Sequence, residues 1–156
     1  MGNGKRPNGE QRAAPDTTSH PPLPQPDTPT TETAPIAVEP REQLRSRTKL
    51  LGLRVIRLVD ALPKTTAAQI VARQVLRSAL SVGANYRAAC RARSRAEFIA
   101  KIGIVEEEVD ETHYWLEILG ESELMDEARL GSLLDETSEL TAMVVASIRT
   151  ARKGAR

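Results

Sequence analysis

The sequence has few of the residues on which disulfide-stabilised, membrane-spanning or base-stacking proteins depend. A single cysteine, Cys90, excludes an intrachain disulfide framework and a multi-cysteine zinc site. No run of 18 apolar residues occurs, and no apolar stretch typical of a secretory signal is present. Aromatic residues make up 3% of the chain, which is too few for a surface that stacks bases. These absences predict a soluble, cytoplasmic protein with no membrane association.

Proline is almost missing after residue 40. Nine of the ten prolines lie in residues 1–40, among Thr, Gly, Asn and Gln and with almost no large apolar side chains. Such a segment buries too little apolar surface to offset the entropy of ordering its backbone. We therefore expect a disordered N-terminal tail over residues 1–40 and one folded domain over residues 41–156.

Motifs of catalytic, nucleotide and metal sites are also missing. Neither G-x-G-x-x-G nor G-x-x-x-x-G-K-S/T occurs, and Cys90 has no histidine nearby in sequence to activate it. Asp110 and His113 have a spacing used in di-iron bundles, but the chain's other histidine is His20 in the tail, so no second motif exists. The acids at 106–111 spread around a helix as a solvated face does. We predict a protein that is not an enzyme and has no cofactor, metal or small-molecule substrate.

The chain does contain apolar residues at helical spacing. Intervals of three and four predict helices over residues 42–62, 65–91, 95–119 and 126–153. The connections are short, which makes consecutive helices antiparallel, so the predicted fold is an all-α, up-down-up-down four-helix bundle. The residues expected to face its core are Leu44, Thr48, Leu51, Val55, Leu58, Leu62, Ile70, Val71, Val75, Leu76, Ala79, Val82, Gly83, Tyr86, Phe98, Ile102, Val105, Val109, Thr112, Leu116, Leu119, Leu130, Leu133, Leu134, Leu140, Val144 and Ile148.

Capping residues predict where these helices begin and end. Thr65 or Thr66 is suited to cap the second helix, because a hydroxyl accepts a hydrogen bond from a free backbone N–H. Ser94 opens the third helix with an acid three residues later, the pattern of a capping box. We expect Gly120 to stop that helix and Asp126 to cap the fourth.

The net charge of +1 hides an asymmetry between the two halves of the domain. Residues 41–101 contain 14 Lys and Arg against 3 acids, a balance of +11, and residues 102–156 contain 5 against 13, a balance of −8. The halves attract each other within one subunit or between neighbouring subunits, or the basic half is left for polyanions. The sequence leaves these alternatives open.

Basic residues gather around the connection between the second and third predicted helices. Because a guanidinium donates two parallel hydrogen bonds to phosphate, such a cluster is a candidate nucleic-acid-binding surface. The alternative is that the cluster provides solubility and pairs with the acidic third and fourth helices. The residues concerned are Arg73, Arg77, Arg87, Arg91, Arg93, Arg95 and Lys101.

Three motifs resemble the four-helix bundle proteins of the ribosomal-RNA intervening-sequence protein family. They are RSALSVGANYR at 77–87, SRAEFIAK at 94–101 and EVDETHYWL at 108–116, and the resemblance extends over about residues 44–153. It implies a homopentamer. Through a relative, the accessory protein of diversity-generating retroelements, it also implies a scaffold that binds nucleic acid and a reverse transcriptase. Ala88 stands where the family usually has a glutamate.

The motif residues are expected to have structural roles. Ser81 and Asn85 lie one helical turn apart, and we predict that they form a buried polar latch that fixes helix register. Trp115 lies beside the predicted apolar seam, where it packs on the outer core or anchors a subunit interface. The full set is Ser81, Asn85, Ser94, Glu97, Phe98, Glu111, Tyr114, Trp115 and Leu116.

The function expected from these features is that of a non-enzymatic oligomeric scaffold. Its basic surface on the first two helices would contact RNA or a nucleic-acid-associated protein. The alternative is a protein-interaction module with no nucleic-acid role, in which the charge asymmetry serves self-assembly alone.

Overall fold

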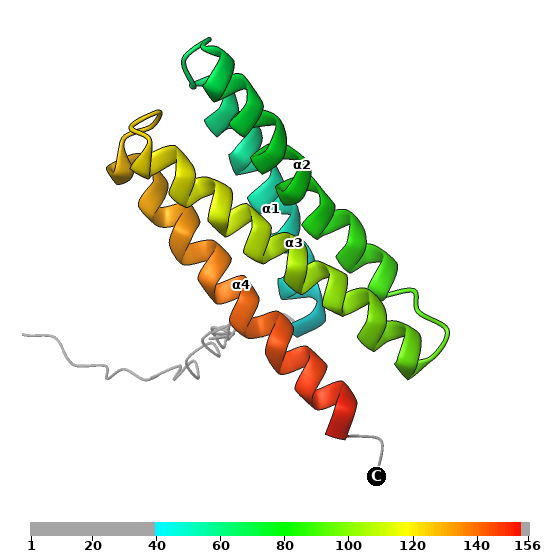
Figure 1. The fold of residues 1–156 in the computed structure, drawn as a ribbon. Coiled ribbons are helices and arrows are strands. Elements are labelled where there is room, and N and C mark those ends of the chain that lie inside the picture. Colours follow the sequence, from blue (N-terminus) through cyan, green and yellow to red (C-terminus); the bar gives the residue numbers. More distant parts are fainter. Residues whose placement is uncertain (1–39, 154–156) are drawn as a thin grey trace, which may run out of the picture. The chain divides into compact units, whose positions relative to one another are not determined.

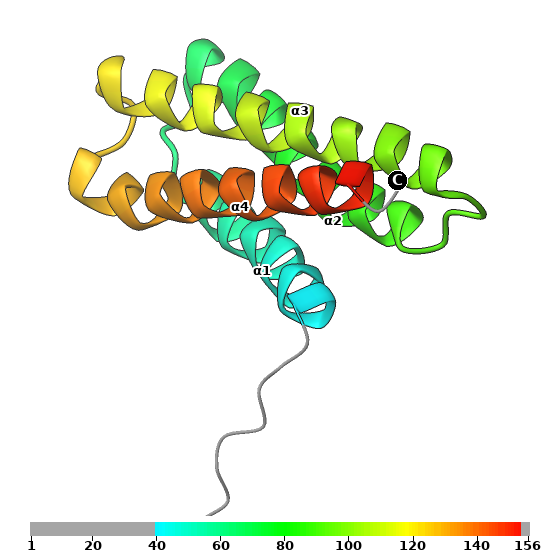
Figure 2. The ribbon, with the colours of Figure 1, turned by 90° about the horizontal axis from the view of Figure 1, so that it is seen from below.

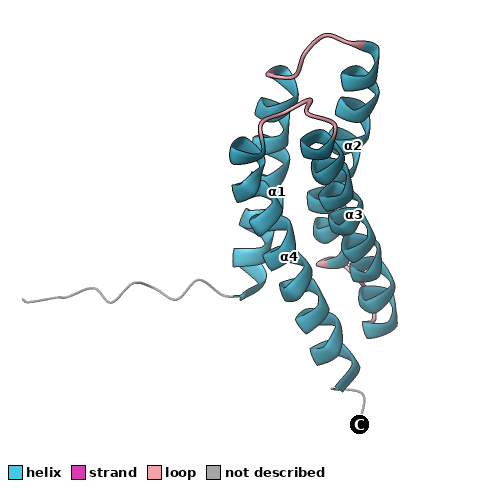
Figure 3. Ribbon diagram, turned by 60° about the vertical axis from the view of Figure 1, so that its left-hand side comes forward, coloured by secondary structure: helices cyan, strands magenta, loops and turns pink. Residues whose placement is uncertain are grey.

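The computed structural model describes residues 40–153 as four helices (Figure 1). They are α1 (Pro40–Asp60), α2 (Thr66–Ala89), α3 (Arg95–Glu121) and α4 (Glu127–Lys153). Helices adjacent in sequence pack against each other, and α4 returns to α1, so each helix has two neighbours. In this part of the chain the helices are joined only by short loops (Figure 3). The predicted antiparallel four-helix bundle is confirmed.

The predicted tail over residues 1–40 lies outside the described residues except for Pro40. Pro40 is the first residue of α1 rather than the last residue of the tail. Proline suits this position, because the first helical N–H has no partner within the helix and the proline ring already holds a helical φ.

Three of the predicted caps are present. The Thr65 hydroxyl accepts a hydrogen bond from the backbone N–H of Ala68 at 3.2 Å. The Ser94 hydroxyl accepts one from Glu97 N–H at 3.1 Å, and the Glu97 carboxylate accepts one from Arg93 N–H at 2.7 Å. In the usual capping box the acid accepts the N–H of the capping residue itself, which is Ser94 here; in this protein it accepts the N–H of the preceding residue, Arg93. At the start of α4 the Asp126 carboxylate accepts the N–H of Ala128 at 2.8 Å.

The prediction that Gly120 stops the third helix is wrong. Helix α3 continues to Glu121, and the left-handed residue after it is Glu123, with a φ of 57°. Gly120 instead provides space for α4, since a Cβ at this position would lie 3.3 Å from Cδ1 of Leu130. The glycine is explained by helix packing and not by backbone conformation.

The core is formed by the predicted apolar faces, with one clear exception. All six predicted core residues of the first helical segment, from Leu44 to Leu62, are buried. Ile70 is 54% exposed, so its predicted core position is wrong. Ala68 and Val75 take the inward positions in this part of α2, and at 100° per residue Ile70 points away from Ala68. Five further predicted core residues are only partly buried: Val71, Leu76, Gly83, Phe98 and Leu134.

Small residues lie where α1 and α2 pack against each other. A Cβ on Gly83 of α2 would lie 3.4 Å from the carbonyl oxygen of Thr48 in α1. A Cβ on Gly52 of α1 would lie 3.1 Å from Cδ2 of Leu80. Helix α1 crosses α4 at an angle instead of lying along it (Figure 2). The close α1–α2 contact and the oblique α1–α4 contact together determine where the bundle surface is hollowed.

Replacing Gly131 by alanine is expected to stabilise the protein. Gly131 lies inside α4, and a Cβ built on it has no neighbour within 4 Å. Alanine restricts the unfolded chain and favours a helix over glycine by about 1 kcal/mol. Urea denaturation should therefore show an increase of about 0.5–1 kcal/mol in the free energy of unfolding. A decrease would show that the surroundings of Gly131 are more crowded than in this structure.

Candidate nucleic-acid interface

Arg47 of α1 forms ion pairs with two acids of α4. Its Nε lies 2.8 Å from Oε1 of Glu136, and its second terminal nitrogen lies 2.5 Å from Oε2 of Glu139, both on α4. Both hydrogen bonds raise the pKa of the Arg47 guanidinium, and the bond to Glu136 has the larger effect. Part of the opposite charge on the two halves of the domain is thus neutralised between α1 and α4.

Arg77 of α2 is similarly paired with acids of α3. It donates a hydrogen bond to Glu111 and lies 3.7 Å from Oε2 of Glu108. The pKa of Glu111 is lowered by Arg77 and, to a lesser extent, by the hydrogen bond from the Trp115 indole. Burial raises the pKa of Glu108. Arg77 therefore has a structural partner already, as the alternative interpretation of the basic cluster expects.

The other predicted binding residues lie in three different environments. Lys101 pairs with Glu97 one turn away, at 2.8 Å. Arg87 lines a groove between α1 and α2. The remaining four are exposed and have no ion pair with any residue of the described range: Arg73 on α2, and Arg91, Arg93 and Arg95 around the α2–α3 connection.

The fold adds basic residues from two distant segments to this connection. The start of α1, the α2–α3 connection and the end of α4 lie at the same end of the bundle (Figure 1). One cavity there is lined by residues of all three elements, among them Arg41, Arg93 and Thr150. We call this region the basic end; its basic residues are Arg41, Arg91, Arg93, Arg95, Arg149, Arg152 and Lys153, and its acids are Glu42 and Glu97.

The cavity at the basic end has a volume of about 850 Å³ and an apolar floor. Leu44, Tyr86, Phe98 and Met143 line it, where α1 and α4 diverge. The Tyr86 hydroxyl donates a hydrogen bond to the carbonyl oxygen of Arg41 at 3.0 Å, which fixes the end of α2 to the start of α1. Burial raises the pKa of the Tyr86 hydroxyl, and the neighbouring Cys90 thiol raises it further. The tyrosine is thus held as a neutral donor under the cationic rim.

At the opposite end of the bundle, the α3–α4 connection is acidic. The end of α3, the loop after it and the start of α4 hold Glu121, Glu123, Asp126 and Glu127, with Arg129 as the one nearby base in this segment. Along α3 and α4 the charge therefore changes from basic at one end to acidic at the other, while the end of α1 and the α1–α2 connection beside the acidic end hold Arg57 and Lys64. The basic residues at the end of α4 were not part of the predicted cluster, because they lie far from the α2–α3 connection in the sequence.

The buried polar latch is formed by residues other than those predicted. Ser81 and Asn85 are half-buried, and neither side chain hydrogen-bonds to a residue between 40 and 153. Ser78 of α2 and Thr112 of α3 are both fully buried, and the Thr112 hydroxyl donates to the Ser78 hydroxyl at 3.0 Å. Ser78 in turn donates to backbone carbonyls of its own helix, so the pair is satisfied. The i, i+4 spacing pointed to the correct helix but to the wrong residues.

The two neighbouring aromatics of α3 differ in exposure. Trp115 packs on the outside of the core and donates its indole N–H to Glu111 at 3.1 Å. Tyr114 is half-exposed, and its ring meets that of Trp115 edge to face, with centroids 4.9 Å apart. Leu116 is fully buried, whereas Phe98 is partly buried beside the cavity of the basic end. Tyr114, more than Trp115, is available to a partner.

His113 and Cys90 are the two residues for which metal or nucleophilic chemistry was weighed. His113 Nδ1 lies 2.7 Å from the hydroxyl of Thr137, which is buried on α4. Cys90 is a partly buried free thiol at the end of α2. Over residues 40–153 no three His, Cys, Asp or Glu side chains are grouped to hold a metal ion. None of the four helices is both long and apolar enough to cross a membrane.

Comparison with known proteins agrees with this bundle. The family model described as 23S rRNA-intervening sequence protein matches residues 43–146. A crystal structure of a protein with unknown function from the S23 ribosomal protein family of Bacteroides thetaiotaomicron is 30% identical, with a TM-score of 0.67, and the match covers 71% of this chain and 99% of that one. Among curated proteins no sequence matches this chain. The chain therefore belongs to the 23S rRNA-intervening sequence protein family.

Proposed function

We propose that this protein is a self-associating helical scaffold in the cytoplasm that binds RNA through its basic end. The observation that carries the proposal is that three segments with exposed basic residues, the start of α1, the α2–α3 connection and the end of α4, lie at one end of the bundle (Figure 1). Three of these residues, Arg91, Arg93 and Arg95, are exposed and unpaired with the described acids. The protein has no catalytic role in this proposal.

Recognition at the basic end would depend mainly on the phosphate backbone. Arginines that neutralise phosphates release bound counterions, which gives affinity without base specificity. Phe98 is the one aromatic that borders the cavity with part of its ring accessible, so extensive base stacking is not expected. A folded RNA with closely spaced phosphates fits this surface better than a long single strand.

The family supports the same class of partner. Its description refers to an intervening sequence of 23S rRNA, and the similar crystal structure is assigned to a ribosomal protein family. Structured ribosomal RNA is therefore the first ligand to test. A nucleic-acid-associated protein, such as the reverse transcriptase bound by accessory proteins of diversity-generating retroelements, is a further partner implied by the sequence resemblance. A closed ring of five subunits is likewise implied by that resemblance alone.

Neutralising the α2–α3 connection is expected to weaken RNA binding. Arg91→Gln, Arg93→Gln and Arg95→Gln together remove three positive charges from exposed positions. The dissociation constant for a fluorescently labelled RNA hairpin should rise at least about 10-fold at low salt, and the slope of log affinity against log salt should fall by about 2–3. Fluorescence anisotropy over about 50–300 mM salt measures both.

A matched control removes the same charge elsewhere. Arg57→Gln, Lys64→Gln and Arg129→Gln are also exposed, and Lys64 and Arg129 lie toward the other end of the bundle. This variant should bind the hairpin nearly as well as the unmodified protein. Equal losses in both variants would show that binding follows net charge alone and would contradict an interface at the basic end.

The second candidate is a protein-interaction module without a nucleic-acid role. Its support is that Arg77 and Lys101, two of the predicted binding residues, are paired with acids inside the subunit. In that case the unmodified protein would show no salt-dependent affinity for the hairpin.

A further inference from the structure

The cavity at the basic end has the size of a site for a small organic group. Its volume of about 850 Å³ lies within the range of about 300–1,000 Å³ that is usual for ligand sites. Two of its apolar side chains come from different helices, Phe98 from α3 and Met143 from α4, and both are only partly buried. A hydrogen bond from Arg47 at 3.4 Å holds the Met143 sulfur in place. Phe98 and Met143 suit a flat ring, because aromatic faces stack and thioethers make favourable contacts with ring edges.

Hydroxyl groups border the same cavity. Ser147 donates its proton to the backbone carbonyl of Met143 at 2.9 Å, so its oxygen can still accept a hydrogen bond. Thr150 is exposed, and its hydroxyl makes no hydrogen bond with any residue between 40 and 153, so it can donate as well as accept. A ring with donors and acceptors along its edge therefore has partners here. This is the chemistry of a nucleobase and not that of a hydrocarbon.

Positive charge surrounds the cavity and continues beyond it. Arg41, Arg93 and Arg95 line it, and Arg93 and Arg95 have no ion pair with a described acid. Arg149 and Arg152 continue the charge along the end of α4. A single apolar carboxylate, as in a fatty acid or at a peptide C-terminus, would neutralise only one of these charges. A base that belongs to a chain of phosphates uses the cavity and its cationic surroundings together.

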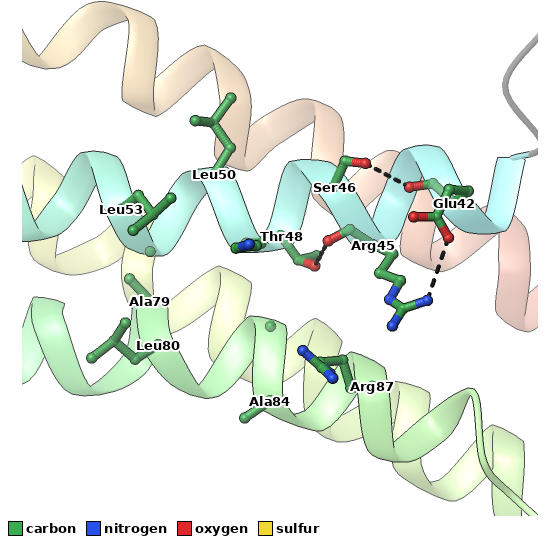
Figure 4. A pocket seen from close by; sticks show the side chains of 13 residues that line it. Glu42, Arg45, Ser46, Thr48, Leu50, Leu53, Ala79, Leu80, Ala84 and Arg87 are labelled. Atoms are coloured by element: carbon green, nitrogen blue, oxygen red, sulfur yellow. Dashed lines mark hydrogen bonds and ion pairs between the residues drawn. The ribbon is translucent and has the colours of Figure 1, made fainter.

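A second large hollow of the described residues lacks this combination. It is the groove between α1 and α2, the α1–α2 groove, with a volume of about 950 Å³. Arg45 and Arg87 lie at one end of it, with Leu53 and Leu80 at the other (Figure 4). None of the described residues that line the groove is aromatic, so a base would have no ring to stack on. Positive charge beside an apolar surface is thus found twice, but the aromatic face is found only at the basic end.

We infer that the cavity at the basic end receives the base of one unpaired nucleotide, extruded from a folded RNA, while the surrounding arginines hold the neighbouring phosphates. The inference deepens the RNA binding of the proposed function and rests on it. A bulged or looped base leaves its stack at little cost, whereas side chains cannot reach the bases through the narrow major groove of an uninterrupted A-form helix. The protein would therefore distinguish a helix with a bulge from an uninterrupted one, which phosphate contacts alone do not.

Three labelled RNA hairpins test the inference. The first is uninterrupted, the second has a single-nucleotide bulge, and the third has an abasic ribose in place of the bulged nucleotide, so the last two carry the same phosphates. Fluorescence anisotropy with the full chain at fixed salt should show that the bulged RNA binds about 10-fold more tightly than either of the others, as expected for one stacked base.

The RNA series separates the inference from the proposed function. Equal affinities for the bulged and the abasic RNA would overturn the inference, while binding through phosphates would stand. The absence of measurable affinity for all three RNAs would overturn the proposed function itself.

Protein variants test whether the base lies in this cavity. Ala146→Leu fills the cavity from an exposed position of α4, so this variant should bind the bulged and the abasic RNA with equal affinity. Ala142→Leu is the matched control: it makes the same change one turn earlier on α4, at an exposed position outside the cavity lining, and should keep the preference. Phe98→Leu keeps an apolar side chain but removes the aromatic face, so the preference should fall to about 3-fold or less.

The preference is a ratio of two affinities measured on one variant, and circular dichroism checks that each variant is folded. A partial change in stability therefore does not imitate the expected result. An undiminished preference in both Ala146→Leu and Phe98→Leu would overturn the inference. So would a loss of preference in Ala142→Leu equal to that in Ala146→Leu, because the effect would then not depend on the cavity.

Discussion

Replacing Leu116 by alanine is expected to lower the free energy of unfolding by about 2–5 kcal/mol. Leu116 is fully buried on the inward face of α3, toward the end of the helix, so its loss removes apolar burial and leaves a cavity among well-packed neighbours. Urea denaturation of the full chain measures the change. Ile70→Ala is the matched control: Ile70 is 54% exposed, and its loss should cost no more than about 0.5 kcal/mol.

Phe98 provides a graded comparison. Although the same helical spacing places Phe98 and Leu116 on one face of α3, Phe98 is only partly buried and borders the cavity of the basic end. Its replacement by alanine should therefore cost less than that of Leu116. A cost below about 0.5 kcal/mol for Leu116→Ala would contradict the inward face assigned to α3.

Replacing Gly83 by valine is the second large effect that we expect. The Cβ of valine would lie 3.4 Å from the Thr48 carbonyl oxygen, and its two methyl groups would be forced into the backbone of α1. Helix α1 would have to move away from α2, so a loss of about 1–3 kcal/mol in the free energy of unfolding is expected, with partial loss of the α1–α2 groove.

The comparison with other substitutions separates crowding from helix propensity. Gly83→Ala should be close to neutral, because the better helix propensity of alanine offsets a tight contact. Gly131→Val introduces the same side chain where nothing lies within 4 Å of the Cβ, and it should not destabilise the protein by more than about 0.5 kcal/mol. Similar losses at both glycines would contradict the close approach of α1 and α2.

The basic residues of the first half of the domain are divided among different tasks. Arg47 and Arg77 neutralise acids of α4 and α3 within the subunit. Lys49 and Arg87 line the α1–α2 groove, and the exposed arginines of the α2–α3 connection belong to the basic end. The alternatives that the sequence left open therefore do not exclude each other, because each uses different side chains.

The sequence by itself determined the four helices and most of their inward faces. Both depend on local information: apolar spacing of three and four, and caps such as Thr65, Ser94 and Asp126, whose side chains bond to backbone groups two or three residues away. The motifs at 77–87, 94–101 and 108–116 were sufficient to indicate the family. These features need no knowledge of how the helices are arranged.

Only the tertiary structure decided the features that depend on how the helices meet. Periodicity gives each helix an apolar side, but not its rotation or its crossing angle with a neighbour. It therefore could not show that Ser78, and not Ser81, would meet Thr112, or that Gly120 would serve to admit Leu130. The basic end likewise unites residues about 50–110 positions apart, because antiparallel helices of similar length bring the start of α1, the α2–α3 connection and the end of α4 together.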